Sequence, residues 1–200
     1  MNTAYVPQIK RIDLSKPILF DCGNLDLNEF FTEDAVAYQN NLLAKTYQCL
    51  KDGKVVALFS VCNDSIPLSD STKKDFPERK RLRSYPTVKL VRLGVCNPHQ
   101  KKGIGSDILR FLKIFFIVRN KTGCRFITVD AYNKPGVIRF YEKNGLKLLT
   151  EDDKNKKTRV MFCDLLPYHN TIESMSEVKR DIENTIKEVE ILFYPRPGTR

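Results

Sequence analysis

The feature that most constrains the fold is a strand, turn, helix and strand pattern in the middle of the chain. The apolar run TVKLVRLGV (87–95) precedes a helical pattern at 103–120, and a second apolar run, CRFITVDAY, follows at 124–132. The helical pattern repeats every three or four positions, through Ile104, Ile108, Leu112, Phe115 and Phe116. Two apolar strands joined by a helix predict parallel neighbours in one buried sheet.

Other patterns extend this unit on both sides. Helices are expected at 26–40, where Asn24 or Asp26 can cap the start, and at 134–144. A hairpin is expected in 45–64 with its turn at Asp52-Gly53, and further strands at 146–152 and 158–166. Together these elements predict an α+β fold with three layers: a mixed central sheet of about six to seven strands with helices on both faces.

Two segments interrupt or follow this domain. Residues 65–86 are rich in proline, serine and basic residues and are expected to form a basic loop insertion, while 167–200 are expected to form a C-terminal amphipathic helix and tail. The helix carries an apolar stripe of Met175, Val178, Ile182, Ile186 and Val189. We therefore expect one domain at 1–166 with the helix packed back on it. The oligomeric state stays open between a monomer and a homodimer.

Charge and cysteine content limit the partners and the compartment. The net charge of +10 predicts an anionic partner, either a nucleic acid or a phosphate-bearing cofactor, although charge also serves solubility. No apolar run has the length of a membrane span or signal peptide, so a soluble cytoplasmic protein with no membrane partner is expected. The six cysteines are scattered singly, which favours free thiols over disulfides and predicts no metal site.

The turn after the first central strand, Gln100 to Ser106, has the composition of a phosphate-binding turn. Free amides at a helix start, the helix dipole and close backbone approach at glycine all favour a phosphate or pyrophosphate. A dinucleotide fingerprint would need a third glycine where Ile108 stands, and the nucleoside triphosphate loop is absent. A turn that uses glycine only for its backbone shape remains the alternative.

This turn resembles that of the GNAT superfamily of N-acetyltransferases, whose signature is Q/R-x-x-G-x-G/A between a strand and a helix. Gln100, Gly103 and Gly105 fill that pattern. The resemblance implies that the turn binds the pyrophosphate of acetyl-coenzyme A, a co-substrate, through residues Gln100, Lys101, Lys102, Gly103, Ile104, Gly105 and Ser106. It also implies that the pantetheine arm runs along the preceding strand at Leu93, Gly94 and Val95.

A second segment, VDAYNKPGVIRFYEKNGLKLL (129–149), resembles the family's downstream strand and helix. By this resemblance Asn133 contacts the pantetheine, and Tyr141 is the general acid that protonates the leaving thiolate. The chemistry suits a phenol, because its pKa of about 10 lies near that of a thiol. Tyr141 as a simple core aromatic is the alternative.

The strand at 87–95 has no carboxylate where many family members place a glutamate base, and His99 is the nearest imidazole. This favours an acceptor that is partly neutral at pH 7, such as an α-amine with a pKa of about 7.7–8.0 rather than a lysine near 10.4.

The pattern also resembles the GNAT branch of toxin-antitoxin acetyltransferases, which makes aminoacyl-tRNA a candidate acceptor. RNA could be contacted by basic residues Lys73, Lys74, Arg79, Lys80, Arg81, Arg83, Arg92, Lys101, Lys102 and Arg110. A non-catalytic nucleic-acid-binding module and an assembly protein that uses the C-terminal helix are the alternatives to an enzyme.

Overall fold

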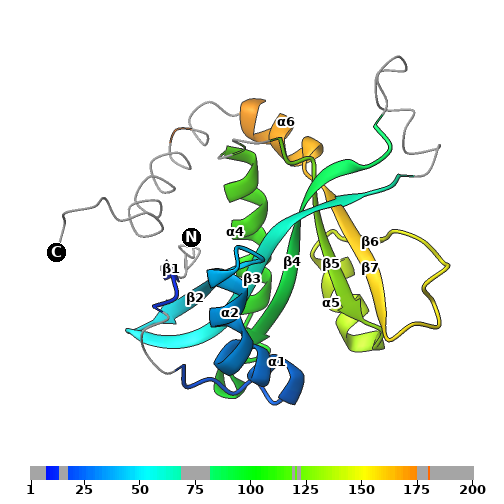
Figure 1. Ribbon diagram of the computed structural model, residues 1–200. Helices are drawn as coiled ribbons and strands as arrows, with labels where there is room; N and C mark the ends of the chain where they lie inside the picture. Colours follow the sequence, from blue (N-terminus) through cyan, green and yellow to red (C-terminus); the bar gives the residue numbers. More distant parts are fainter. Residues whose placement is uncertain are drawn as a thin grey trace.

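A sheet of seven strands forms the centre of the computed structural model, which describes residues 8–13, 18–68, 82–118, 120, 123–174 and 180 (Figure 1). The strands are β1 (Gln8–Arg11), β2 (Lys45–Lys51), β3 (Lys54–Ile66), β4 (Tyr85–Val95), β5 (Phe126–Tyr132), β6 (Lys147–Leu148) and β7 (Thr158–Asp164). They lie in the order β1-β2-β3-β4-β5-β7-β6, and the neighbours are antiparallel except β4 and β5. The predicted parallel pair is therefore confirmed.

Helices cover both faces of the sheet, as predicted. They are α1 (Leu25–Glu29), the π-helical turn η1 (Phe30–Asp34), α2 (Ala35–Asn40), the 3-10 turn η3 (Asn97–His99), α4 (Ile104–Val118), α5 (Pro135–Lys143) and α6 (Leu166–Ser174). Consecutive side chains of β3 point to opposite faces of the sheet. Leu58 packs with η1 on one face, whereas Phe59 belongs to the core under α4 on the other. Figure 1 shows α1 and α2 in front of the sheet and α4 behind it. None of the helices within the described ranges is long and apolar enough to cross a membrane.

The two central strands separate before they end. The parallel pairing of β4 and β5 runs only from Thr87↔Phe126 to Leu90↔Val129. At the same level β4 carries a bulge against β3, since Ser60 pairs with Arg92 and Val61 with Leu90. A bulge bends its strand and increases the local twist. The last part of β4 thereby diverges from β5, and an opening forms between them.

The hairpin of β2 and β3 turns at Asp52-Gly53, as predicted, with both residues at positive φ. The helix predicted at 26–40 is present, but η1 interrupts it, with Phe30 and Phe31 both buried. The strand predicted at 146–152 is only two residues long, because the chain then leaves the sheet to form a loop. No pattern in the sequence predicts β1, whereas α6 lies at the start of the segment where the C-terminal helix is predicted, 167–200.

The predicted basic insertion begins and ends in strand, since β3 extends to Ile66 and β4 starts at Tyr85. Its central basic residues, Lys73, Lys74, Arg79, Lys80 and Arg81, and the apolar stripe of the predicted C-terminal helix lie outside the described residues. Just before that stripe, α6 packs against α4, where Lys113 donates to the Tyr168 hydroxyl at 3.1 Å.

A buried ion pair organises the loop between β6 and β7. The Arg159 guanidinium donates to Asp153 Oδ1 at 2.8 Å and to the Thr150 carbonyl, and the Val160 amide donates to Asp153 Oδ2 at 2.7 Å. Asp153 and Arg159 are only 4% and 9% exposed. Burial alone would raise the pKa of Asp153, but its hydrogen bonds to Val160 and Arg159 outweigh burial and hold that pKa below its ordinary value.

We expect Asp153→Asn to lower the midpoint of thermal unfolding at pH 7, because Arg159 loses its buried charged partner and keeps the exposed Glu151 at 3.3 Å. A carboxylate whose pKa is lowered on folding stabilises the protein above the unfolded-state pKa of about 3.9 and loses this effect as the pH falls through the folded-state value. Circular dichroism melts of variant and wild type should therefore differ fully well above pH 4 and converge only as the pH falls through the lowered folded-state pKa of Asp153. Asp152→Asn changes the same charge on an exposed neighbour; an equal loss there would contradict the role of the ion pair.

Candidate active site

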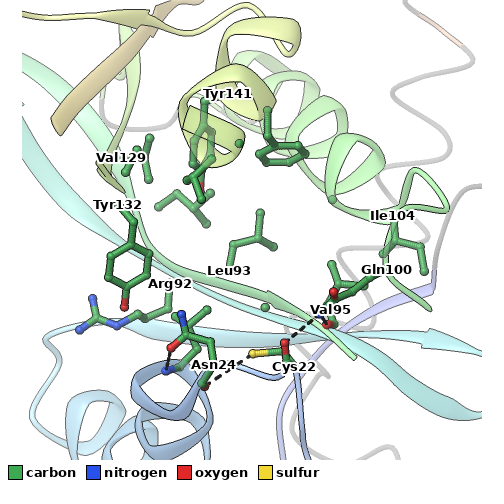
Figure 2. Close-up of a pocket in the computed structure, with 18 of the residues that line it drawn as sticks. Cys22, Asn24, Arg92, Leu93, Val95, Gln100, Ile104, Val129, Tyr132 and Tyr141 are labelled. Carbon is green, nitrogen blue, oxygen red and sulfur yellow. Dashed lines mark hydrogen bonds between the residues drawn. The ribbon is translucent and has the colours of Figure 1, made fainter. Parts of the chain in front are cut away.

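A pocket of about 690 Å³ opens where β4 and β5 diverge (Figure 2). One end is formed by the turn before α4 and the other by the start of α1 with the end of β5. Tyr141 reaches into the pocket from α5 between these two ends. Of the site residues predicted from sequence, the structure brings together along this pocket Tyr141, Leu93, Gly94, Val95, Gln100, Lys101, Gly103, Ile104, Gly105 and Ser106.

The turn before α4 presents backbone to the pocket. Lys101 has φ 59° and Gly103 has φ 87°, so the chain makes two left-handed steps before α4 begins at Ile104. A Cβ built on Gly103 would have no atom within 4 Å, which leaves open space over its backbone. Because the first amides of a helix have no intrahelical acceptor and carry the positive end of the dipole, this turn is suited to bind an anion.

Gln100 connects three segments instead of pointing freely into the pocket. Its Nε2 lies 2.8 Å from the Cys22 carbonyl, 3.0 Å from the Val95 carbonyl and 3.2 Å from Asn97 Oδ1. The two N–H groups of the amide can therefore hold the segment before α1 against the end of β4. Gly94 makes this contact sterically feasible, since a Cβ there would lie 2.8 Å from the Phe20 ring.

Tyr141 lies in the last turn of α5 and is 7% exposed. Burial raises its pKa above the ordinary tyrosine value, so the phenol stays protonated at neutral pH. Its neighbour Phe140 packs edge-on against it, with ring centroids 5.0 Å apart. A Cβ on Gly105 would lie 3.0 Å from the Phe140 ring, so the absence of a side chain at Gly105 lets α5 approach the start of α4.

Two predicted site residues lie apart from the others. Lys102 is exposed on the turn and outside the pocket lining. Asn133 follows β5, but its side-chain amide donates to the Lys154 carbonyl at 2.7 Å and the Lys156 carbonyl at 3.0 Å, and it does not line the pocket. Asn133 thus fixes the loop before β7 to the end of β5.

The pocket also contains two carboxylates from outside the strand at 87–95, Asp26 and Asp130. Asp26 enters from α1, where the Tyr132 hydroxyl donates a hydrogen bond to its Oδ2. Asp130 enters from β5, but Lys89 pairs with it at 2.6 Å. Asp26 and Tyr132 are 106 residues apart in sequence, so no local pattern links them. The expected capping role belongs to Asn24, whose side chain accepts from the Leu27 amide.

Comparisons with known proteins agree with this geometry. The model of the acetyltransferase (GNAT) family matches residues 18–146, a span that includes both ends of the pocket. No curated protein matches the chain by sequence.

Three solved structures illustrate the fold. AtaT in complex with acetyl-methionyl-tRNAfMet is 21% identical, with a TM-score of 0.64, 76% of this chain and 89% of that chain covered. AtaTR bound with AcCoA is 20% identical, with a TM-score of 0.64 and coverage of 80% and 94%. A mutant of KacT in which phenylalanine replaces one tyrosine is 17% identical, with a TM-score of 0.64 and coverage of 82% and 97%. At these identities the likeness concerns the fold.

Proposed function

The chain belongs to the acetyltransferase (GNAT) family, and we propose that it transfers the acetyl group of acetyl-CoA directly to an amine. One observation carries this proposal: a single pocket joins the anion-suited turn, the diverging edge of β4 and the buried phenol of Tyr141. A thioester substrate with a phosphate-rich tail needs these three features in this order. The absence of a covalent enzyme intermediate follows from direct attack by the amine.

The coenzyme occupies the end of the pocket at the turn in this proposal. The amides of Gly103, Ile104, Gly105 and Ser106 bind the pyrophosphate, and Lys101 and Lys102 add positive charge around it. The pantetheine arm lies against the backbone of Leu93 to Val95, beyond the last β4–β5 pair. Asn133 supports this site from outside the pocket, because its amide is bound to loop carbonyls.

Tyr141 is the proposed general acid. The amine nitrogen forms a bond to the thioester carbonyl carbon, the C–S bond breaks, and sulfur leaves with the electron pair. Tyr141 then gives its proton to sulfur and regains one from solvent, while the acetylated nitrogen loses its extra proton. Burial raises the pKa of Tyr141. The same apolar surroundings also raise the pKa of the leaving thiol, so the two pKa values stay close enough for proton transfer.

A second, more specific candidate is acetylation of the α-amine of aminoacyl-tRNA. The solved structure of AtaT in complex with acetyl-methionyl-tRNAfMet, which has a similar fold, favours it. The net charge of +10 supports it too, and described basic residues that could contact RNA are Arg83, Arg92, Lys101, Lys102 and Arg110. An α-amine is also less basic than a lysine, which suits the lack of a carboxylate on β4.

Incubation with acetyl-CoA labelled in the acetyl group tests the proposal. The protein is mixed in turn with small amines, peptides and a charged tRNA pool, and both labelled product and free CoA thiol are measured. We expect thiol release to match label in one acceptor class. Binding of acetyl-CoA without transfer to any class would favour a nucleic-acid-binding module, and a lack of binding would favour an assembly role.

A further inference from the structure

The end of the pocket away from the turn carries an unusual set of charges. Asp26 comes from α1, Tyr132 from the end of β5 and Arg92 from β4 just after the bulge. Figure 2 shows Tyr132 and Arg92 side by side near Asn24, across the pocket from Gln100 and Ile104. Since the coenzyme is assigned to the turn, this end is left for the acceptor.

Asp26 offers a carboxylate oxygen to this end of the pocket. Tyr132 donates to Oδ2, and within the described residues no ion pair links Asp26 to a cation. Asp130, the other carboxylate here, is already neutralised by Lys89. Burial, followed by the contact with Asp26, raises the pKa of Tyr132 to about 12, so this hydroxyl remains a donor at neutral pH. The Oδ1 atom of Asp26 is therefore the negative group that can meet a cationic ligand.

Arg92 offers the complementary charge. Its guanidinium carbon lies 4.9 Å above the centre of the Phe30 ring, and Nη1 donates to the Val91 carbonyl at 3.0 Å. Nε is buried without a hydrogen-bond partner. No ion pair joins Arg92 to a carboxylate in the part of the chain that the structure describes. The guanidinium thus lines the pocket with a positive charge that no described carboxylate compensates, which favours a ligand oxygen that meets it from the pocket side.

We propose that this end of the pocket recognises an α-aminoacyl group, with Asp26 binding its ammonium and Arg92 binding its carbonyl oxygen. Tyr132 is a positioning residue that holds Asp26 between α1 and β5. The inference rests on the proposed acetyltransferase function and names its acceptor class. An amine without a nearby carbonyl would satisfy Asp26 and leave Arg92 unpaired.

The basicity of the amine supports this class. A carboxylate beside an ammonium stabilises the cation and makes the amine harder to deprotonate, yet the attacking nitrogen must be neutral. An α-amine, with a reference pKa of about 7.7–8.0, can tolerate such a shift and still be partly neutral near pH 8. A lysine-type amine near 10.4 would become almost entirely cationic.

Two probe acceptors test the inference through release of CoA thiol. Leucine methyl ester has an α-amine next to a carbonyl, and 3-methylbutylamine has a similar side chain without the ester. The two free amines differ in pKa, but this difference is a property of the amines and is the same whichever variant is assayed. The informative quantity is therefore how a substitution changes the ratio of kcat/KM for the two acceptors.

We expect Asp26→Asn to raise KM for the ester about tenfold, the equivalent of one charge-assisted contact, with KM for acetyl-CoA unchanged. Asparagine can still accept the Tyr132 hydrogen bond, so this variant removes the charge and keeps the link between α1 and β5. Glu29→Gln removes the same charge from the same helix outside the pocket and should match wild type.

Arg92→Met should reduce the ester-to-amine ratio about tenfold, whereas the exposed control Arg139→Met should not. Tyr132→Phe should raise KM for the ester without lowering the affinity for acetyl-CoA.

Ester kinetics within twofold of wild type in both Asp26→Asn and Arg92→Met would overturn the inference, as would wild-type transfer to the amine but not the ester. Failure of the proposed function looks different: wild type would then release no thiol with any amine.

Discussion

Tyr141→Phe is expected to lower kcat by about 10²- to 10⁴-fold, the usual contribution of a general acid, with acetyl-CoA affinity nearly unchanged. The substitution removes one oxygen and keeps the ring, so the packing of Tyr141 against Phe140 is preserved. Without a proton donor, sulfur must leave as a thiolate in surroundings that disfavour charge. Initial rates of thiol release, together with calorimetric titration of acetyl-CoA, separate the two effects.

A matched control exists on the other face of the sheet. Tyr38 packs edge-on against Phe30, with centroids 5.1 Å apart, and does not line the pocket. Tyr38→Phe removes the same atom and should keep wild-type kcat. An unchanged kcat in Tyr141→Phe would show that Tyr141 is only a core aromatic, and a lowered acetyl-CoA affinity with unchanged kcat would place its role in binding.

The central unit of the fold could be predicted because its signals are local. The strand at 87–95, the helix after it and the strand at 124–132 each carry their own periodicity, and a buried parallel pair follows from their order. The hairpin at Asp52-Gly53 is specified by two residues. In contrast, the π-helical turn η1 and the shortness of β6 depend on tertiary packing, so the periodicity of the sequence does not predict them.

The acceptor end of the pocket contains residues that no sequence pattern could have brought together. The strand β4 carries no carboxylate that could act as a base. The carboxylate that lies in the pocket, Asp26, arrives from a helix whose sequence suggested a capping role. Its partner Tyr132 stands 106 residues away. Only the folded sheet brings α1 over the end of β5, so no spacing rule could have paired them.

Sequence reasoning also identified several residues whose observed contacts are with the protein itself. The pattern of Gln100, Gly103 and Gly105 predicts a phosphate turn, yet Gln100 binds backbone carbonyls and Gly105 makes room for Phe140. Among these three, Gly103 alone combines positive φ with open space over its backbone. The experiment that isolates ligand binding should therefore change Gly103.

Gly103→Ala is expected to weaken acetyl-CoA binding by about 5- to 30-fold. A left-handed conformation costs a residue with a side chain about 1–2 kcal/mol, which corresponds to that range of Kd. The exposed turn of the free variant can relax to negative φ, so the cost is met when the ligand requires the original backbone. Calorimetric titration should show the higher Kd, with the unfolding temperature close to that of wild type.

Gly53→Ala is the matched control, because Gly53 has φ 73° and a Cβ there also has no atom within 4 Å. Gly53 lies in a hairpin held by the adjacent pair Lys51↔Lys54, so it cannot relax. Its strain should lower the unfolding temperature and leave Kd unchanged. Acetyl-pantetheine, which lacks the pyrophosphate, adds a second comparison: Gly103→Ala should not change its kcat/KM. An equal loss with this substrate would mean that the turn shapes the pocket without binding phosphate.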